Sequence, residues 1–355
     1  MTRKVQTAVA GVTGYAGAEL ARLLLRHPRL KGAPPVFAGR MEEGDRARGG
    51  IPLIEIHPQL ADSSGSGNLR LEAFSWELLA ARGVDVLFLA TPHEQSREWV
   101  PEALRRGMRV IDLSGAWRLS EPSNRAIYGF EDEGTEQAAA TQAQAVYGMP
   151  ELHRSEIAGA RLISNPGCYA TAVILALKPL VAAGLLDLDR GIVADAKSGV
   201  SGAGKAPTAK THFMYAADNL SAYGVFTHRH TGEVLEQLGI GSGEIVFAPH
   251  LLPIPRGILA TMYVRFKAAQ TRAAVTEVYR KFFAASPMVR FYGRTLPQIQ
   301  YVVRTNYADI GFQLDSSGRR AVIVSCLDNL LKGAAGQAVQ NLNVALGWGE
   351  AEGLE

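Results

Sequence analysis

Cysteine is scarce in this chain of 355 residues, which contains only Cys168 and Cys326. Two cysteines cannot form a disulfide framework, so a reducing compartment, the cytoplasm, is the simpler expectation. Long hydrophobic runs are also missing. The longest apolar-rich stretch, residues 170–186, is interrupted by a lysine–proline pair and by Gly184, whereas a membrane span needs about 18 uninterrupted apolar residues. We therefore expect no membrane partner.

Excess charge of one sign is the third absence. The 37 basic and 34 acidic residues give a formal net charge of +3 and are interspersed along the chain. This balance argues against a nucleic-acid partner. What is present is a hydrophobic content of 47%, which is enough for a packed core. At about 100–200 residues per domain, the length predicts two domains.

The first third of the chain alternates strand and helix patterns. Apolar runs at 5–10, 34–38, 84–90 and 109–113 read as strands, and the helical patterns 15–27 and 94–106 fall between them. Such alternation is typical of a doubly wound, Rossmann-type α/β domain.

The pattern changes after about residue 165. Predicted strands at 191–196, 244–248, 258–266 and 321–327 are separated by turns or by a helix near 271–285. This indicates a second, α+β domain with a mixed, largely antiparallel sheet. The last pattern, residues 329–346, is helical, with its alanines and leucines spaced for one buried face.

A glycine-rich turn follows the first predicted strand and opens the first helix. Its sequence is Gly11-Val12-Thr13-Gly14-Tyr15-Ala16-Gly17. In this position glycines let the backbone approach a pyrophosphate, whose charge is met by free N–H groups at the helix N-terminus. The second strand ends at Gly39-Arg40, and an arginine there suits the 2′-phosphate of NADP. The alternative is that Arg40 is a solvated loop residue.

The two cysteines stand in different settings. Cys168 follows Ser164-Asn165-Pro166-Gly167 and opens a predicted helix. A free thiol has a pKa of about 8.5, and a helix N-terminus lowers it toward the reactive thiolate. Backbone N–H groups and the Asn165 amide could hold an oxyanion there. Cys326 lies inside an apolar strand and reads as a core residue. Cys168 is therefore the candidate nucleophile.

A nucleophilic cysteine needs an acid or base, and His228-Arg229-His230 supplies two candidates, with Glu233 in the same segment. The sequence does not decide between the histidines; His228 is taken first. No third ligand cluster accompanies them, so no metal is expected. The loop Gly199–Lys205 resembles a phosphate-binding loop but lacks the Ser or Thr that holds magnesium. Lys205, Arg118 and Arg256 remain candidate contacts for an anionic substrate.

Together these stretches resemble the N-acetyl-γ-glutamyl-phosphate reductase family, a relative of aspartate-semialdehyde dehydrogenase. Eight segments carry the resemblance in family order: 11–20, 112–119, 146–152, 164–171, 199–205, 228–233, 253–258 and 328–337. The chain departs from the family pattern at three points, with Gly115-Ala116 in place of Ala-Asp, Ala170 in place of Pro, and Gly39 in place of Ser.

The resemblance implies an NADPH-dependent reduction of an acyl phosphate to a semialdehyde in arginine biosynthesis, with release of inorganic phosphate. Cys168 would form a thioester and a histidine of the 228–230 segment would act as acid or base. The site residues carried over also include Asn329 near the nicotinamide and Glu233 at the substrate. The first domain would span 1–165 and be completed by the helix 329–355. Residues 166–328 would form the catalytic domain and the interface of a homodimer or homotetramer.

Two other functions stay open at this point. The homologous lysine-pathway enzyme reduces an aminoadipyl phosphate, which is one methylene longer, and a pocket separates such substrates by only about 1–3 kcal/mol. A non-catalytic NADP-binding regulator is the alternative from another class, and it requires an unreactive, buried Cys168.

Overall fold

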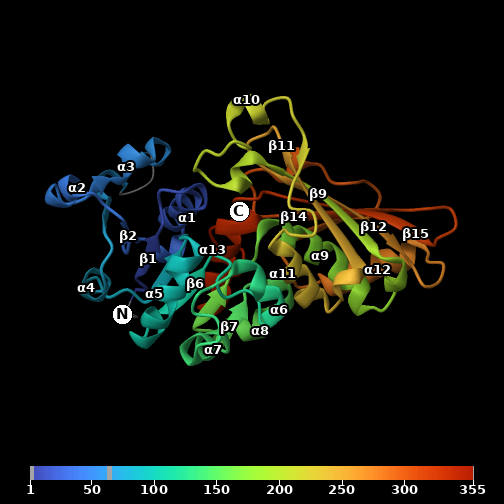
Figure 1. The fold of residues 1–355 in the computed structure, drawn as a ribbon, viewed down its shortest axis with the longest axis horizontal. Helices are drawn as coiled ribbons and strands as arrows, with labels where there is room; N and C mark the ends of the chain where they lie inside the picture. Colours follow the sequence, from blue (N-terminus) through green and yellow to red (C-terminus); the bar gives the residue numbers. More distant parts are fainter. Residues whose placement is uncertain (1–3, 62–65, 355) are drawn as a thin grey trace. The chain divides into compact units, whose positions relative to one another are not determined.

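Two units make up the chain, and their segments alternate along the sequence. The computed structural model describes residues 4–61 and 66–354. Within them the first unit draws on the described residues up to Arg118, on Phe130–Asn165 and on the described residues from Ala335 onward, and the second on Leu119–Gly129 and Pro166–Ala334. In Figure 1 the blue elements at the start of the chain and the red helix α13 (Gly336–Ala345) both belong to the first unit.

An eight-stranded sheet forms the centre of the first unit, in the order β3-β4-β2-β1-β5-β6-β8-β7. Neighbouring strands are parallel except for β3 and β4. The strands are β1 (Thr7–Ala10), β2 (Val36–Gly39), β3 (Ile51–Pro52), β4 (Arg70–Ala73), β5 (Val86–Leu89), β6 (Arg109–Asp112), β7 (Ala145–Tyr147) and β8 (Leu162–Ser164). Every residue of β1 and β5 is buried, as expected for central strands that are covered on both faces.

The described part of the first unit also contains helices. They are α1 (Tyr15–Arg26), α2 (Glu43–Ala47), α3 (Leu53–Ile56), α4 (Trp76–Ala81), α5 (His93–Arg105), α7 (Glu136–Gln142), α8 (Pro150–Gly159) and α13. In α1 the buried residues Leu20, Leu23 and Leu24 share one side. All ten residues of α13 are buried, and the helix packs against α1 and α8.

The second unit contains a seven-stranded mixed sheet in the order β10-β11-β9-β12-β15-β14-β13. Four of its six strand pairs are antiparallel: β10–β11, β9–β12, β12–β15 and β14–β15. The strands are β9 (Ile192–Gly199), β10 (Ser221–Ala222), β11 (Ile245–Leu252), β12 (Ile258–Arg265), β13 (Val289–Tyr292), β14 (Ala308–Leu314) and β15 (Arg320–Leu327).

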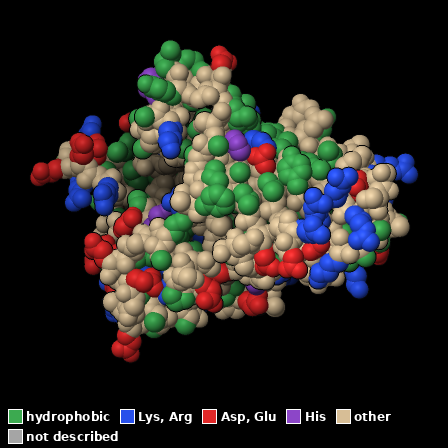
Figure 2. All heavy atoms as spheres, turned by 45° about the vertical axis from the view of Figure 1, so that its right-hand side comes forward, with side chains coloured by type: hydrophobic (Ala, Val, Ile, Leu, Met, Phe, Trp, Pro, Cys, Tyr) green, Lys and Arg blue, Asp and Glu red, His purple; other side chains and the backbone are tan. Residues whose placement is uncertain are grey.

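One face of this second sheet is covered by helices and the other is open. Helix α9 (Cys168–Ala182) contacts β9, β12, β14 and β15, and α11 (His230–Leu238) and α12 (Arg272–Phe282) pack against α9. Along β12 the residues alternate between buried and more exposed positions, so one set faces the helices. On the other face Val193, Val246 and Tyr263 are exposed, and Figure 2 shows apolar side chains gathered on this part of the surface.

The short segment 119–129 belongs to the second unit because it is bonded to α11. Glu236 of α11 accepts hydrogen bonds from the Ser120 N–H (2.9 Å), the Glu121 N–H (2.9 Å) and the Asn124 side chain (3.1 Å). The segment contains the short helix α6 (Pro122–Arg125). The strand and helix patterns of the sequence predict these residues within the first domain, 1–165, because such patterns do not show the contact with α11.

The expected fold class is confirmed: a doubly wound parallel domain and an α+β domain with a largely antiparallel sheet. The final helix differs in detail from the predicted one. Residues Leu331–Ala335 form one turn of π-helix before α13 begins at Gly336. Over the described ranges, no helix has both the length and the apolar content that a membrane crossing requires.

Candidate active site

Cys168 is the first residue of α9, directly after the turn that follows β8. Gly167 precedes it as the N-cap in extended conformation, and the N–H and hydroxyl of Thr171 both donate to the Gly167 carbonyl (2.9 and 3.0 Å). Cys168 is partly exposed, whereas Cys326 is fully buried. Burial raises the pKa of Cys326 to about 12, with the nearby Asp309 carboxylate adding to the effect. The two thiols therefore differ as the sequence predicts.

His230 packs against the backbone next to Cys168. A Cβ built on Gly167 would lie 2.6 Å from the Cδ2 and Cε1 atoms of the His230 ring, so only glycine leaves room for the imidazole there. Glu233, one turn later on α11, is fully buried, and its Oε2 accepts the Gly167 N–H at 2.9 Å. Its Oε1 lies 3.9 Å from His230 Nε2. Glu233 thus connects the turn before Cys168 to the helix that carries the histidine.

His228 has a different environment. Its Nδ1 accepts the backbone N–H of His230 (3.1 Å), and the rings of Tyr169, Tyr223 and Phe247 surround it with centroids 5.5–5.6 Å away. Burial, together with the smaller effect of the neighbouring Arg229 charge, lowers the pKa of His228 to about 4. His228 is therefore neutral at physiological pH and is fixed as a hydrogen-bond acceptor.

Two further contacts of the cysteine turn are missed by the sequence analysis. A Cβ on Gly333, in the π-helical turn, would lie 2.7 Å from the Cβ of Cys168. Tyr223 lies against both Tyr169 and His228, with its hydroxyl 3.5 Å from that of Tyr169. The small-residue run Gly333-Ala334-Ala335-Gly336 was a signal for the first contact. No local pattern marks the second contact, because Tyr223 and Tyr169 are far apart in the sequence and meet only in the folded unit.

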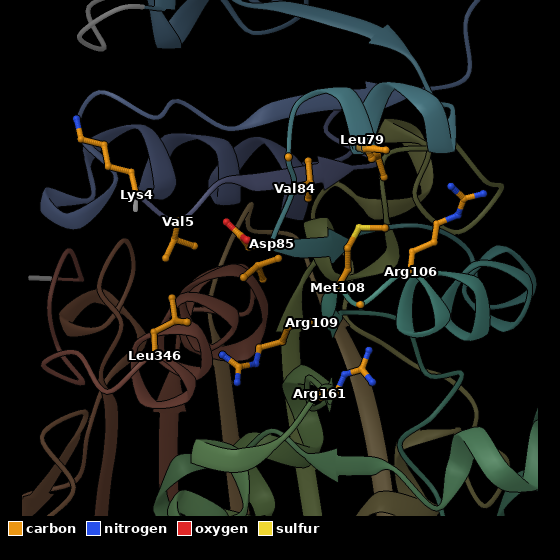
Figure 3. A pocket seen from close by; sticks show the side chains of 14 residues that line it. Lys4, Val5, Leu79, Val84, Asp85, Arg106, Met108, Arg109, Arg161 and Leu346 are labelled. Carbon is orange, nitrogen blue, oxygen red and sulfur yellow. The ribbon is translucent and has the colours of Figure 1, made fainter. Parts of the chain in front are cut away.

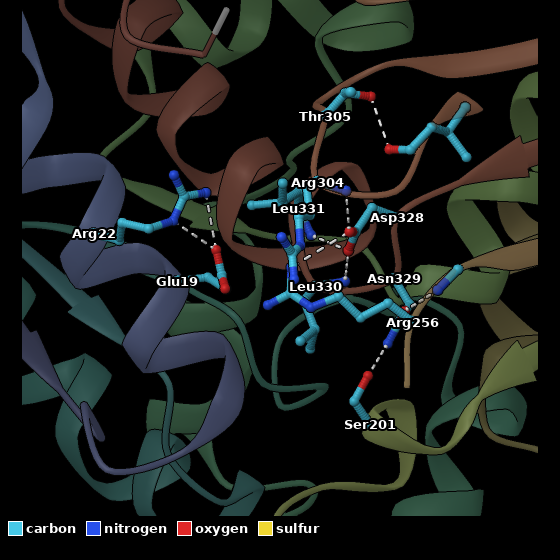
Figure 4. Close-up of polar contacts among 12 residues, drawn as sticks. Glu19, Arg22, Ser201, Arg256, Arg304, Thr305, Asp328, Asn329, Leu330 and Leu331 are labelled. Atoms are coloured by element: carbon cyan, nitrogen blue, oxygen red, sulfur yellow. Dashed lines mark hydrogen bonds and ion pairs between the residues drawn. The ribbon is translucent and has the colours of Figure 1, made fainter. Parts of the chain in front are cut away.

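Asn329 holds two loops of the second unit together. Its Oδ1 accepts the Gly257 N–H (2.8 Å) and its Nδ2 donates to the Ser201 hydroxyl (2.9 Å), as Figure 4 shows. Beside it, Arg256 forms an ion pair with the buried carboxylate of Asp328 at 3.4 Å. A Cβ on Gly199 would lie 2.7 Å from the backbone nitrogen of Arg256. The glycine-rich loop 199–205 and the loop 253–257 are therefore closely packed.

The other candidate anion contacts are placed as follows. Lys205 lies in an exposed stretch after the 3-10 turn Val200–Ala203. Arg118, in the first unit, is buried and donates to the carbonyls of Asn165 (2.7 Å) and Leu113 (2.8 Å). Asn165 is also buried, and its Oδ1 accepts from Asn341 of α13 (3.0 Å). Arg118 and Asn165 thus have a bracing role within their unit, and their roles toward a substrate stay predictions.

The glycine turn between β1 and α1 has the space that a dinucleotide requires. A Cβ on Gly11, whose φ is +90°, would lie 2.7 Å from the Ala90 carbonyl carbon, and one on Gly17 would lie 2.7 Å from the Cα of Val12. These two glycines permit the tight turn and the close helix packing. At Gly14, by contrast, the nearest atom is 3.7 Å away, so the backbone there is open to a ligand.

A pocket of about 310 Å³ opens beside this turn. It is lined by Gly11, Thr13 and Gly14 and, at the end of β2, by Arg40. The Arg40 guanidinium is exposed and has one long hydrogen bond, 3.4 Å, to Gln95. The site residues and the lining therefore fit a dinucleotide pyrophosphate, and Arg40 has the freedom to meet a further phosphate.

Comparison with known proteins identifies the two domains. Residues 6–160 match the family "Semialdehyde dehydrogenase, NAD binding domain", and residues 168–329 match "Semialdehyde dehydrogenase, dimerisation domain". Among solved structures, aspartate semialdehyde dehydrogenase II from Vibrio cholerae, complexed with ASA, has a TM-score of 0.67 at 18% identity and covers 97% of this chain and 98% of its own. Aspartate semialdehyde dehydrogenase with NADP from Candida albicans has a TM-score of 0.67 at 15% identity, covering 96% of this chain and 98% of its own. These likenesses establish the fold.

Curated relatives are much closer in sequence. Two proteins named N-acetyl-gamma-glutamyl-phosphate reductase each match 99% of this chain. The one from Dehalococcoides mccartyi is 41% identical, with 98% of its own length covered, and the one from Symbiobacterium thermophilum is 42% identical, with 97% of its own length covered. One from Methanocaldococcus jannaschii is 39% identical over 98% of the chain and 97% of its own length. The chain belongs to the N-acetyl-gamma-glutamyl-phosphate reductase family and has the two domains of a semialdehyde dehydrogenase.

Proposed function

We propose that this chain reduces N-acetyl-γ-glutamyl phosphate to N-acetylglutamate 5-semialdehyde, with NADPH as reductant and inorganic phosphate as the released product. The observation that carries the proposal is the arrangement around Cys168. Its partly exposed thiol is at the first residue of α9, and His230 and Glu233 both contact Gly167, the residue before it. A step in arginine biosynthesis and a cytoplasmic location are part of this proposal, since a reactive thiol needs a reducing compartment.

Cys168 is the nucleophile in this proposal. The N-terminus of a helix favours the thiolate form of a cysteine placed there. The sulfur attacks the acyl carbon, a carbon–sulfur bond forms, and the carbon–oxygen bond to phosphate breaks, so that phosphate leaves with the electron pair. Backbone N–H groups of the first turn, with the Asn165 amide, are the predicted donors to the oxyanion. The product of this half-reaction is a thioester on Cys168.

We assign the acid–base role to His230. Its ring lies against Gly167, next to the nucleophile, and Glu233 lies 3.9 Å from its Nε2. A carboxylate at that distance stabilises the protonated imidazole. After hydride transfer to the thioester carbon, the imidazole can give its proton to the oxygen on that carbon. His228 is less suited, because burial lowers its pKa to about 4. Its part is to hold the His230 backbone through Nδ1.

The cofactor supplies a hydride to the acyl carbon when it is bound. The residues that would hold it are Gly11, Thr13, Gly14, Tyr15 and Gly17 at the pyrophosphate, Arg40 at the 2′-phosphate and Asn329 at the nicotinamide. For Asn329 this role would add to its hydrogen bonds with Gly257 and Ser201.

The substrate carries a carboxylate and a phosphate, and the proposed contacts are cationic. Arg256 is one-fifth exposed beside Asp328, and its planar guanidinium suits a carboxylate or phosphate. Lys205 and Arg118 are the other proposed contacts. We give Glu233 a positioning role as well as its predicted place at the substrate, because its carboxylate is bonded to the Gly167 N–H.

The chain is also proposed to form a homodimer through the open face of the second sheet. Exposed Val193, Val246 and Tyr263 lie in register on three neighbouring strands, an apolar surface of the kind that a second copy covers. Replacement of Val246 by Arg is expected to give monomers in light scattering after size exclusion, whereas an exposed Val225→Arg control retains the parent mass. A parent mass of four chains would indicate a homotetramer instead.

The reaction is tested most directly in reverse. Purified protein is mixed with N-acetylglutamate semialdehyde, NADP and phosphate, and NADPH formation is followed by absorbance. The rate should depend on phosphate, fall to background in Cys168→Ser and persist in Cys326→Ser. If the parent protein reduces no NADP with this aldehyde in phosphate or arsenate, the proposed reaction is wrong.

The same assay separates the two alternatives. The aldehyde one methylene longer tests the aminoadipyl branch, which the names of the relatives do not favour. A non-catalytic regulator is not favoured either, since Cys168 is partly exposed.

A further inference from the structure

A second pocket of the first unit lies at the amino ends of the strands, opposite the glycine turn. It is lined by residues at or just before the amino ends of strands, namely Val5 before β1, Asp85 before β5, Arg109 at the start of β6 and Arg161 before β8. The glycine turn follows the carboxyl end of β1. This pocket has a volume of about 900 Å³, and Figure 3 shows the side chains around it.

Within the described part of the chain, two arginines of this pocket have no carboxylate partner. Arg109 donates to the carbonyls of Ala160 (2.8 Å) and Ala345 (2.9 Å), and Arg161 donates to the carbonyl of Leu104. In residues 4–61 and 66–354, neither guanidinium forms an ion pair. Burial and the neighbouring Arg161 together lower the pKa of Arg109. Arg109 therefore has a second cation, Arg161, near it in the pocket.

The other basic groups of the pocket are already engaged. Arg106 pairs with Glu102 and lies over the ring of Trp76, and the Lys4 ammonium donates to the Lys31 carbonyl at 3.2 Å. Among the three arginines that line the pocket, Arg109 and Arg161 thus differ from Arg106 in lacking a carboxylate partner within the described residues.

Capping of helix ends accounts for only part of this arrangement. The carbonyls that Arg109 and Arg161 bind lie at or near the ends of α5, α8 and α13, where arginines are favourable. A guanidinium carries five N–H donors, however, and these bonds use two from Arg109 and one from Arg161. The remaining donors of both groups are available to a ligand, and a small anion would relieve their repulsion.

The walls indicate the rest of the ligand. Val5, Leu79, Val84, Met108 and Leu346 give the pocket an apolar lining, and Asp85 is its one acidic lining residue. We propose that this pocket binds a small organic anion, with its phosphate or carboxylate head held by Arg109 and Arg161 and its apolar body against these walls. The site is separate from the cofactor pocket and does not depend on the proposed reaction.

Isothermal titration calorimetry on the full-length protein saturated with NADP tests this site. The probes are phenyl phosphate and benzoate, which share an apolar ring and differ in the head group. A charge-assisted hydrogen bond is worth about 1.5–3 kcal/mol, so Arg161→Gln should weaken the preferred probe about tenfold or more. Arg161 is exposed, so this variant should keep the parent melting temperature. Binding of one probe over the other would identify the head group.

The matched control is Arg105→Gln, which removes an exposed arginine from the end of α5 that pairs with Glu102 and does not line the pocket. It should retain affinity within about twofold. Arg109→Lys keeps the charge but loses the fork of donors, and is expected to bind between the parent and Arg161→Gln. The proposal is overturned if neither probe binds the parent protein at millimolar concentration, or if Arg161→Gln binds as tightly as the parent.

Discussion

At the residue scale, the two histidines of the 228–230 segment are expected to behave differently. His230→Gln removes the proposed acid and should lower kcat about 10²- to 10⁴-fold, since glutamine keeps the volume beside Gly167 but cannot transfer a proton. His228→Asn keeps an acceptor for the His230 N–H and should retain most of the activity. Steady-state kinetics of both variants against pH make the comparison. An equal loss in both would contradict the assignment of His230.

Thiol labelling gives a second prediction at this scale. Because burial raises the pKa of Cys326 to about 12, only a very small fraction of that thiol is ionised near neutral pH. Iodoacetamide at pH about 7 should modify Cys168 and abolish activity, whereas Cys326 should react only after unfolding. Mass spectrometry of peptides measures both sites. Labelling of Cys326 in the folded protein at a comparable rate would refute this reading.

The sequence predicts Cys168 as the nucleophile but does not predict which histidine is its partner. Cys168 stands out locally, because Pro166-Gly167 and the helix beside it are visible in the chain. The choice between His228 and His230 depends on which ring meets Gly167, sixty residues away, and on the aromatic rings that bury His228. Such contacts arise only from the packing of α11 on α9. Taking His228 first was therefore a choice that the local pattern could not support.

At the scale of elements, the π-helical turn Leu331–Ala335 is expected to control the cysteine turn. Gly333→Ala would place a methyl group 2.7 Å from the Cβ of Cys168, which forces one of the two backbones to move. We expect a loss of about 1–3 kcal/mol in the free energy of unfolding and slower alkylation of Cys168. Denaturant unfolding and the labelling rate measure these effects.

Gly243→Ala is the matched control, since a Cβ at Gly243 meets no atom within 4 Å. It should change neither quantity appreciably. If Gly333→Ala behaves like this control, the turn does not constrain the cysteine.

The predictable elements are those with a regular apolar pattern. Strands β1, β5, β12 and β15 were expected close to their observed ranges, because continuous or alternating apolar residues mark them. Strand β14 was not expected. It carries a buried carboxylate, Asp309, which is neutralised by Arg290 at 2.6 Å and bonded to the Tyr292 hydroxyl at 2.8 Å. Arg290 and Tyr292 both lie on β13. The sequence of β14 alone therefore does not show how the buried charge of Asp309 is compensated.

At the scale of the whole molecule, stability should fall as the pH becomes acidic. Burial lowers the pKa of His228 from 6.5 to about 4, and burial also lowers the pKa of His27, which bonds Asn343 at 2.9 Å. As the pH falls below 6.5, the unfolded chain therefore takes up these protons before the folded chain does. The stabilisation is complete above that pH and is lost toward pH about 4.

For His228 alone this loss is about 2 kcal/mol between pH about 7.5 and 5. Urea unfolding at the two pH values should show it, and His228→Asn should remove this part of the difference while leaving the contribution of other groups. The burial of His228 as a neutral group would be contradicted if the parent and the variant lost equal stability.

The interleaved segments of the two units have a consequence for synthesis. Helix α13 is buried throughout and packs on α1 and α8, so the first unit lacks part of its core until residues 336–345 have left the ribosome. Residues 166–334, by contrast, are complete before that helix is made. Since domains fold as their residues emerge, the cysteine-bearing unit can finish folding first. The dinucleotide-binding unit, although its glycine turn is translated at the start, is the last to become complete.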